Sequence, residues 1–173
     1  MDRKSFIKNS FIFAGGLAFL PYLSSCEDSV EQANLVLAEL GETIIPETTT
    51  PGSKTLGLHN FVRKMVEDCG DEEQQKLFGK GLVAFESRFK RSNDIIFENA
   101  TPSQRSEFLK TIETGELEAT DEREFEEKEI IERFYSLVKS LTIRGYKNSK
   151  YYMTEVVPYE LVPGRYNPFY KIA

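Results

Sequence analysis

The sequence predicts a single, mainly α domain of about five helices, followed by an irregular C-terminal tail rich in tyrosine and proline. Three observations support this fold class. Apolar residues between positions 31 and 145 recur at steps of three and four, which is the period of an amphipathic helix. Residues that start and stop helices flank these stretches. The chain has 173 residues, which is the size of one domain.

The first 25 residues are predicted to be an export signal rather than part of the fold. Arg3, Lys4 and Lys8 precede an uncharged stretch over 11–22 that contains only apolar, small and proline residues. A basic head followed by a short apolar run is typical of an export signal. The run is shorter than the ~20 apolar residues that a bilayer span requires.

Two short motifs refine this prediction. The run Arg3-Lys4-Ser5-Phe6-Ile7-Lys8 resembles a twin-arginine export signal in which Lys4 replaces the second arginine and Phe6 keeps its place. The run Leu23-Ser24-Ser25-Cys26 resembles a bacterial lipobox, in which cleavage leaves Cys26 as a lipid-modified N-terminus. Acyl chains contribute ~0.8 kcal/mol per buried methylene, so such a cysteine would anchor the chain to a membrane. An ordinary signal peptide followed by a coincidental cysteine is the alternative.

Cleavage before Cys26 would leave a helical domain over 26–173 with 19 basic and 27 acidic residues. This acidic balance argues against nucleic acid as a partner, because phosphates require a surplus of Lys and Arg. Lipidation of Cys26 would leave Cys69 without a partner in the chain. A buried thiol is then the favoured state of Cys69, with an intermolecular disulfide or a reactive group as alternatives. Without lipidation, a Cys26–Cys69 disulfide becomes possible in an oxidising compartment.

The first two helices are predicted from their apolar spacing. One spans 31–45 and ends at Pro46, and a loop rich in Thr, Pro and Gly follows over 46–57. The other spans 58–70, where five apolar residues share one face: Leu58, Phe61, Val62, Met65 and Val66.

Capping signals predict where the next two helices start. Asp71 is a suitable N-cap residue, with Gln74 three residues on. The run Thr101-Pro102-Ser103-Gln104 combines a capping box with proline at the first helical position, and Gly115 is expected to end that helix. The helix that begins at Asp71 has a core stripe of Phe78, Leu82, Phe85 and Phe89.

The longest helix is predicted to start near Asp121 and to end at Gly145, which suits the C′ position. Its acidic first turns suit the positive end of the helix dipole. Six of the eight tyrosines follow Gly145, together with three prolines and without a helical period. This tail is suited to lying across a partner's surface, and packing back onto its own helices is an equal alternative. The core face of the helix is expected to contain Phe125, Ile130, Phe134, Leu137, Val138 and Leu141.

Motifs with catalytic meaning are sparse, and we predict no catalytic, cofactor-binding or metal site in this chain. The run 79–84 matches the G-x-G-x-x-A dinucleotide pattern but lies in a predicted helix, so close helix packing is the favoured interpretation. His59 has no partners at local spacing and is expected to be packed or exposed. The acidic run 116–132 favours a solvated helix face over a catalytic carboxylate pair.

Several other short motifs occur in a characteristic order. They begin with the export signal and a helix that ends at Ile44-Ile45-Pro46. Pro51-Gly52-Ser53 and Gly57-Leu58 follow, and then Phe61-Val62. The most specific part is C-terminal, with Leu141-Thr142-Ile143-Arg144-Gly145-Tyr146, Ser149, Tyr159 and Val162-Pro163-Gly164-Arg165-Tyr166. In this order the motifs resemble the gluconate 2-dehydrogenase subunit 3 family over nearly the whole chain.

The resemblance implies a non-catalytic small subunit of a membrane-associated, periplasmic flavin-dependent dehydrogenase. The implied partner is a large FAD-containing subunit of the glucose-methanol-choline (GMC) class that oxidises a sugar or polyol, with a haem subunit or another acceptor taking the electrons. The small subunit would support export, folding and stability of that partner. We expect the chain to be exported to the periplasm or cell envelope and anchored through Cys26. The partner-binding surface is expected to contain Gly145, Tyr146, Tyr159, Pro163, Gly164 and Tyr166.

Two alternatives belong to other functional classes. A stand-alone envelope lipoprotein could bind a small ligand or scaffold an envelope complex. A self-sufficient hydrolase that uses acidic residues is disfavoured, because the sequence shows no site for it.

Overall fold

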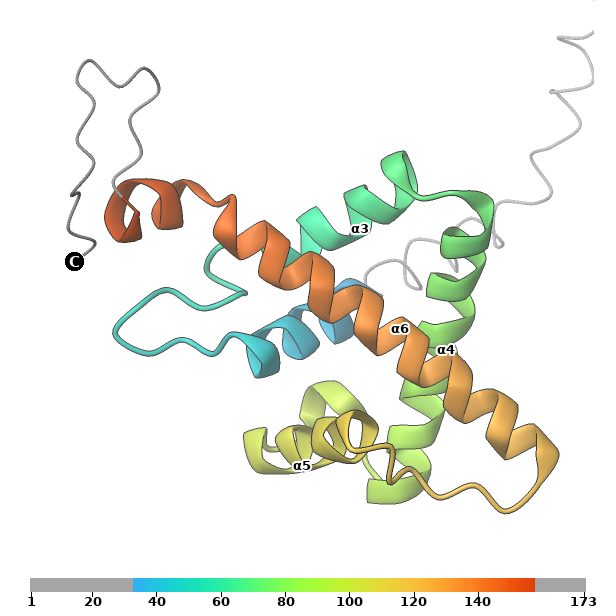
Figure 1. Cartoon of the computed structure of the whole chain (residues 1–173). Coiled ribbons are helices and arrows are strands. Elements are labelled where there is room, and N and C mark those ends of the chain that lie inside the picture. The colour runs from blue at the N-terminus through green and yellow to red at the C-terminus, as the bar shows by residue number, and fades with distance from the viewer. Residues whose placement is uncertain (1–32, 158–173) are drawn as a thin grey trace, which may run out of the picture. The chain divides into compact units, whose positions relative to one another are not determined.

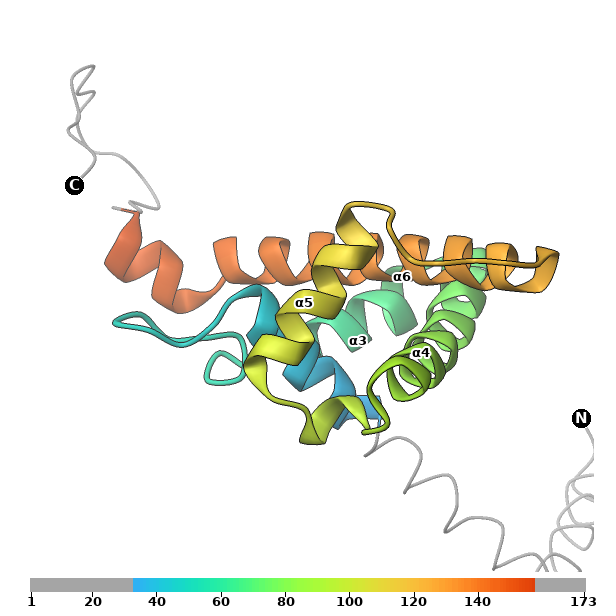
Figure 2. The same cartoon turned by 90° about the horizontal axis from the view of Figure 1, so that it is seen from below.

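The longest helix, α6 (Glu122–Lys147), organises the fold. The computed structural model describes residues 33–157, and those from Val36 onward belong to one compact unit. Figure 1 shows α6 crossing the other helices, and Figure 2 shows them on one side of it. These are a helix over 33–44, α3 (Leu58–Cys69), α4 (Glu72–Asn93) and α5 (Pro102–Glu113). The prediction of a mainly α domain is confirmed, and the described residues contain no strand.

Side-chain caps begin three of the helices as predicted. The Asp71 carboxylate accepts a hydrogen bond from the backbone N–H of Gln74, 2.8 Å away, at the start of α4. Thr101 forms the complete capping box of α5 with Gln104. At the start of α6, the Asp121 carboxylate accepts a hydrogen bond from the backbone N–H of Glu124. Each cap satisfies a backbone N–H that has no partner within the helix.

The core is built around a cluster of phenylalanine rings. Phe85 on α4 lies 5.0 Å from Phe97, 5.4 Å from Phe108 and 5.9 Å from Phe134, measured between ring centroids. Phe97 belongs to the short 3₁₀ helix η2 (Phe97–Asn99), and the other two rings belong to α5 and α6. The tilted and edge-on ring geometry is the arrangement that aromatic pairs prefer. The predicted stripe on α4 therefore joins four elements.

The predicted core face of α6 is wrong at its first turn. Phe125 is 59 % exposed. Its neighbours Glu124 and Glu127 form ion pairs with Arg88 and Arg91 of α4, which turns Phe125 to a different face of the helix. The core of α6 begins further along, with Ile131, Phe134, Tyr135 and Val138 buried.

The end of α6 also differs from the prediction. Gly115 has a φ of +70° after α5, as expected of a residue that ends a helix. Gly145 does not end α6, which continues to Lys147. The chain then forms a further helical turn, η3 (Tyr152–Val156), where an irregular tail was predicted.

Membrane-spanning helices were also sought in the part of the chain that the structure describes. No helix there combines the length and the apolar character that crossing a bilayer requires.

Candidate docking site

Gly145, a predicted partner-binding residue, is buried inside α6. A Cβ atom at this position would lie 2.7 Å from Cδ1 of Phe61 on α3. The glycine therefore allows α3 and α6 to approach more closely than any other residue would. Its place in the sequence looked like a helix end because glycine serves both purposes. Gly145 therefore has a packing role between α3 and α6.

Tyr146, the second predicted docking residue within the described part, is half-buried at the end of α6. Its ring lies 5.6 Å from the ring of Tyr152 in an edge-on arrangement. Ser149 holds the intervening turn, because its hydroxyl accepts a hydrogen bond from the backbone N–H of Tyr152 at 3.2 Å. Its carbonyl accepts another from Met153 at 3.1 Å. The tyrosine pair thus fixes η3 beside the last turn of α6.

The loop over 46–57 is organised by a single carboxylate, that of Glu42. One of its oxygens accepts a hydrogen bond from the backbone N–H of Glu47, and the other accepts one from the backbone N–H of Lys54, each at 2.8 Å. Gly52 passes directly beside this carboxylate. A Cβ atom there would lie 2.5 Å from a Glu42 oxygen and 2.6 Å from the Glu47 nitrogen. The backbone path of this loop therefore requires glycine at the centre of the Pro51-Gly52-Ser53 motif.

Ser53 connects the loop to the helices. Its side chain is fully buried against Gly41, where an added Cβ atom would lie 3.3 Å from the Ser53 Cβ. The same Cβ atom would touch the methyl group of buried Thr142 on α6 at 4.0 Å. The loop motif and the C-terminal motif thus meet at one glycine of the helix over 33–44.

A buried ion pair is the feature that sequence reasoning missed. The Arg105 guanidinium of α5 pairs with the Glu39 carboxylate, and Lys54 pairs with the same carboxylate. Arg105 also donates to the backbone carbonyls of Phe97 at 2.9 Å and Glu98 at 2.6 Å. Glu39 and Arg105 are 66 positions apart, so no local pattern could have found the pair. These bonds join α5, η2 and the helix over 33–44.

A second polar cluster lies between α5 and α6. The Tyr135 hydroxyl donates a hydrogen bond to the Glu113 carboxylate, which also pairs with Lys139. Hydrogen bonds from Lys139 and Tyr135 lower the pKa of Glu113 below its ordinary value of 4.5. Burial, with the Glu113 carboxylate beside it, raises the pKa of Tyr135 above its ordinary value. A carboxylate held ionised and a phenol held protonated are poor proton carriers near pH 7, although two cavities of about 560 and 210 Å³ adjoin the cluster.

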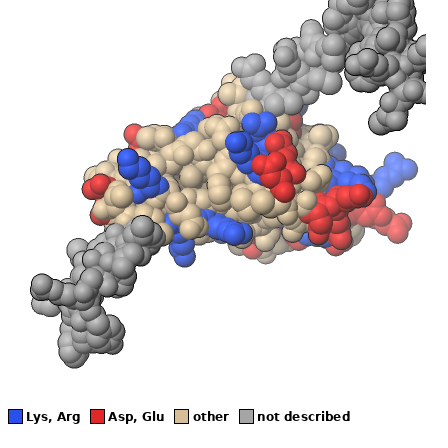
Figure 3. Space-filling model, turned by 90° about the horizontal axis from the view of Figure 1, so that it is seen from above, with Lys and Arg blue, Asp and Glu red and all other residues tan. Residues whose placement is uncertain are grey.

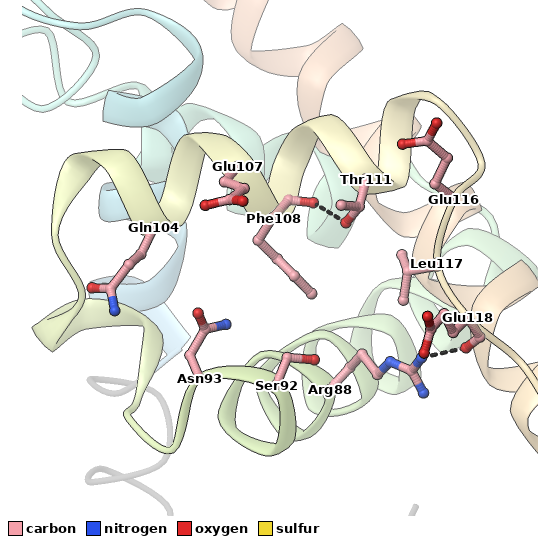
Figure 4. A pocket seen from close by; sticks show the side chains of 10 residues that line it. All are labelled: Arg88, Ser92, Asn93, Gln104, Glu107, Phe108, Thr111, Glu116, Leu117 and Glu118. Carbon is pink, nitrogen blue, oxygen red and sulfur yellow. Dashed lines mark hydrogen bonds between the residues drawn. The ribbon is translucent and has the colours of Figure 1, made fainter.

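Figure 4 shows a further cavity of about 290 Å³ between α4, α5 and the segment that follows α5. This volume is at the lower limit of small-molecule sites, which are roughly 300–1,000 Å³. Several polar side chains around it donate to backbone carbonyls: Arg88 to Glu118, Asn93 to Phe89 and Thr111 to Phe108. The Arg88 bond joins α4 to the segment after α5, whereas those of Asn93 and Thr111 stay within their own helices.

His59 and Cys69 are the other candidate residues in the described part of the chain. Burial, and then the positive charges of Arg63 and Lys54, lower the pKa of His59. Cys69 is exposed at the end of α3, so the expectation of a buried thiol is wrong. It follows the last buried position of α3, Val66, by three residues and lies beyond the core. Within residues 33–157, no group of three or more His, Cys, Asp or Glu side chains has the geometry to hold a metal ion.

The glycines of the dinucleotide-like pattern differ from each other. A Cβ atom on Gly81 would collide with Phe134, coming within 2.7 Å of its Cγ, whereas Gly79 has no atom within 4 Å of the corresponding point. Close helix packing, the favoured interpretation of the pattern, is confirmed for Gly81 and wrong for Gly79.

The other predicted site residues lie outside the described part of the chain. They are Arg3, Lys4 and Phe6 of the export signal, Cys26 of the lipobox, and Tyr159, Pro163, Gly164 and Tyr166 of the tail.

Comparison with known proteins decides the family. The family model for gluconate 2-dehydrogenase subunit 3 matches residues 31–164, which is most of the chain. The chain belongs to this family. No curated protein and no solved structure matches it. In this subunit 3 chain, motif residues that are distant in sequence lie close together: Phe61 of α3 packs against Gly145 of α6, and Ser53 of the loop and Thr142 of α6 both lie beside Gly41.

Proposed function

We propose that this chain is the non-catalytic accessory subunit of a periplasmic, GMC-type flavin-dependent sugar or polyol dehydrogenase. FAD and the oxidation chemistry belong to the large partner subunit, and a haem-containing subunit or another acceptor receives the electrons. The small subunit supports export, folding and stability of the large one.

The arrangement of the family's motifs supports this proposal. The motif residues in the described part act through packing: Gly145 makes room for Phe61, and Gly41 makes room for Ser53. Gly52 gives the loop room beside Glu42. These residues fix the shape of one end of the domain. A fixed shape suits a subunit that presents a surface to a partner, because interfaces depend on shape complementarity.

Export and anchoring are a separate part of the proposal. Arg3, Lys4 and Phe6 direct the chain to the twin-arginine route, which carries folded proteins, and lipidation of Cys26 holds it on a membrane. In cells, Cys26→Ser should move the chain from the membrane fraction to the soluble periplasmic fraction, because one acyl-bearing thioether is lost. An unchanged membrane fraction would overturn the lipid anchor.

Co-expression with a candidate GMC-type flavoprotein subunit tests the accessory role. With the small subunit present, the large subunit should be recovered from the periplasm in a complex, with flavin absorbance and dye-linked oxidation of gluconate or glucose. Without it, the exported, flavin-loaded large subunit should be lost. Equal recovery and activity without the small subunit would overturn the proposal, and so would oxidation by the small subunit alone.

Truncation after Val157 tests whether the C-terminal tail contributes to docking. This truncation retains η3 and the Tyr146–Tyr152 pair, so the described fold is preserved. Loss of co-purification would support a docking role for the tail with Tyr159, Pro163, Gly164 and Tyr166. Full recovery, with an unchanged circular dichroism spectrum, would assign docking to residues before Val157.

A further inference from the structure

Charge is segregated along α6. Residues 121–132 carry seven acidic and two basic side chains, whereas residues 133–154 carry five basic and no acidic ones before Glu155 of η3. A stretch of this length without an acid is unusual in a chain with 28 acidic residues. Figure 3 shows one face of the molecule, on which acidic side chains gather most densely at the right-hand end. The C-terminal half of α6 is therefore a basic segment of an acidic protein.

Internal ion pairs account for only part of this positive charge. Arg133 pairs with Glu73, and Lys139 pairs with Glu113. Arg144, Lys147 and Lys150 are exposed and form no ion pair with any described residue. Within the described residues, these three charges have no anionic partner.

Apolar surface accompanies the free charges. Ile143 is 37 % exposed and lies on the same helix face as Lys147, four residues further on. Val156 of η3, which the tyrosine pair holds beside this end of α6, is 38 % exposed. The helix dipole favours basic residues at a helix C-terminus, but it does not explain exposed aliphatic side chains among them. We call Ile143, Arg144, Lys147, Lys150 and Val156 the basic end.

We propose that the basic end docks against an acidic protein surface on the flavoprotein subunit. This inference rests on the proposed function and adds the chemistry of the contact. Arg144 and the Tyr146–Tyr152 pair are of the residue types that are enriched at protein interfaces, and the partly exposed Ile143 and Val156 add apolar area beside them. A lipid surface fits less well, because surface-bound helices insert large apolar side chains, and each Lys or Arg adds only a modest attraction to anionic lipid. Ile143 and Val156 are the exposed large apolar side chains at this end of the described structure, and two such side chains offer little area for insertion.

Charge reversal tests the proposal. The variant Arg144→Glu/Lys147→Glu is compared with Lys76→Glu/Lys80→Glu, which makes the same charge change on exposed residues of α4. The dissociation constant of each full-length chain for the purified flavoprotein subunit is measured at low and high salt. We expect the α6 variant to bind about tenfold or more weakly at low salt and to lose most of its salt dependence. The α4 variant should bind as the wild type does.

The outcomes separate this proposal from the proposed function. If the wild type does not bind the flavoprotein, the proposed function fails. If it binds and both charge-reversal variants bind equally well, the basic end is not the docking surface, although the accessory role stands. Phosphatidylglycerol vesicles provide a third arm: sedimentation that is lost in the α6 variant, with flavoprotein binding unchanged, would assign the surface to lipid and overturn the proposal.

Folding of the charge-reversal variants is checked independently. Arg144→Gln/Lys147→Gln removes the charges without adding acids at the negative end of the helix dipole. Its binding should be intermediate between those of the wild type and the reversal variant, with an unchanged circular dichroism spectrum. Wild-type affinity in this neutral variant would contradict a docking contact driven by charge.

Discussion

At the residue scale, Glu42 illustrates what a sequence reveals about one side chain. It lies near the C-terminal end of its helix, where the helix dipole disfavours a carboxylate. Its hydrogen bonds to the backbone of Glu47 and Lys54 offset that cost, because charge-assisted bonds to N–H groups are strong. A carboxylate at this unfavourable position of a helix indicates a specific role for Glu42. The sequence does not show which groups the carboxylate binds.

Glu86 supplies a prediction about pH. Burial, and then the neighbouring Glu98 carboxylate, raise its pKa above the ordinary 4.5. The folded state therefore binds this proton more tightly than the unfolded state does, so stability falls as the pH rises from 4.5 through the folded-state pKa. Glu86→Gln should raise Tm at pH 7, and the gain should shrink as the pH falls through the folded-state pKa and be small below 4.5.

Thermal unfolding at pH 7 and at pH 4 measures this effect. Glu129→Gln, at an exposed position of α6, is the matched control and should change Tm little at either pH. A gain for Glu86→Gln that is equal at both pH values would contradict an ionisation effect.

At the element scale, the starts of helices were predictable and one end was not. The caps at Asp71, Thr101 and Asp121 act on backbone groups three residues away, so the sequence alone contains the whole interaction. Gly145 was assigned to a helix end because the sequence does not show Phe61, the residue that requires a glycine there. The same limit applies to Phe125, whose exposure depends on ion pairs between α4 and α6.

Gly79 and Gly81 give a matched pair of predictions on α4. Gly81→Ala should destabilise the protein by about 1–3 kcal/mol, because the new methyl group collides with Phe134. Gly79→Ala should stabilise it by about 0.5–1 kcal/mol, because alanine favours the helix and meets open space. Urea denaturation measures both, and a shift of the same sign in the two variants would contradict the assigned packing.

At the scale of the whole molecule, Arg105 connects parts that are distant in sequence. It bonds to η2 and to the helix over 33–44 from its place on α5. The family resemblance and the helical class could be predicted because they rest on local patterns and their order. The ion pair could not, because it arises only once the helices have packed.

Arg105→Met should therefore cost about 1–3 kcal/mol of stability, because the Glu39 carboxylate keeps its pair with Lys54 but loses Arg105, and the carbonyls of Phe97 and Glu98 each lose one donor. Arg91→Met is the control, because Arg91 is exposed and its pair with Glu127 should be worth about 0–1 kcal/mol. Guanidinium denaturation of both variants gives the comparison. Equal losses would show that the buried pair contributes no more than a surface pair.

The glycine contacts around α6 restrict how the length of the chain can vary. Phe134, Thr142 and Gly145 lie eight and three residues apart, so they share one face of the helix and meet three different helices there. Inserting one residue between Phe134 and Thr142 would turn the two later positions by about 100° relative to the first. Both distal contacts would then leave the core together. An insertion or deletion in this part of α6 should therefore disrupt both contacts at once, so the spacing between Phe134 and Gly145 tolerates no change in length.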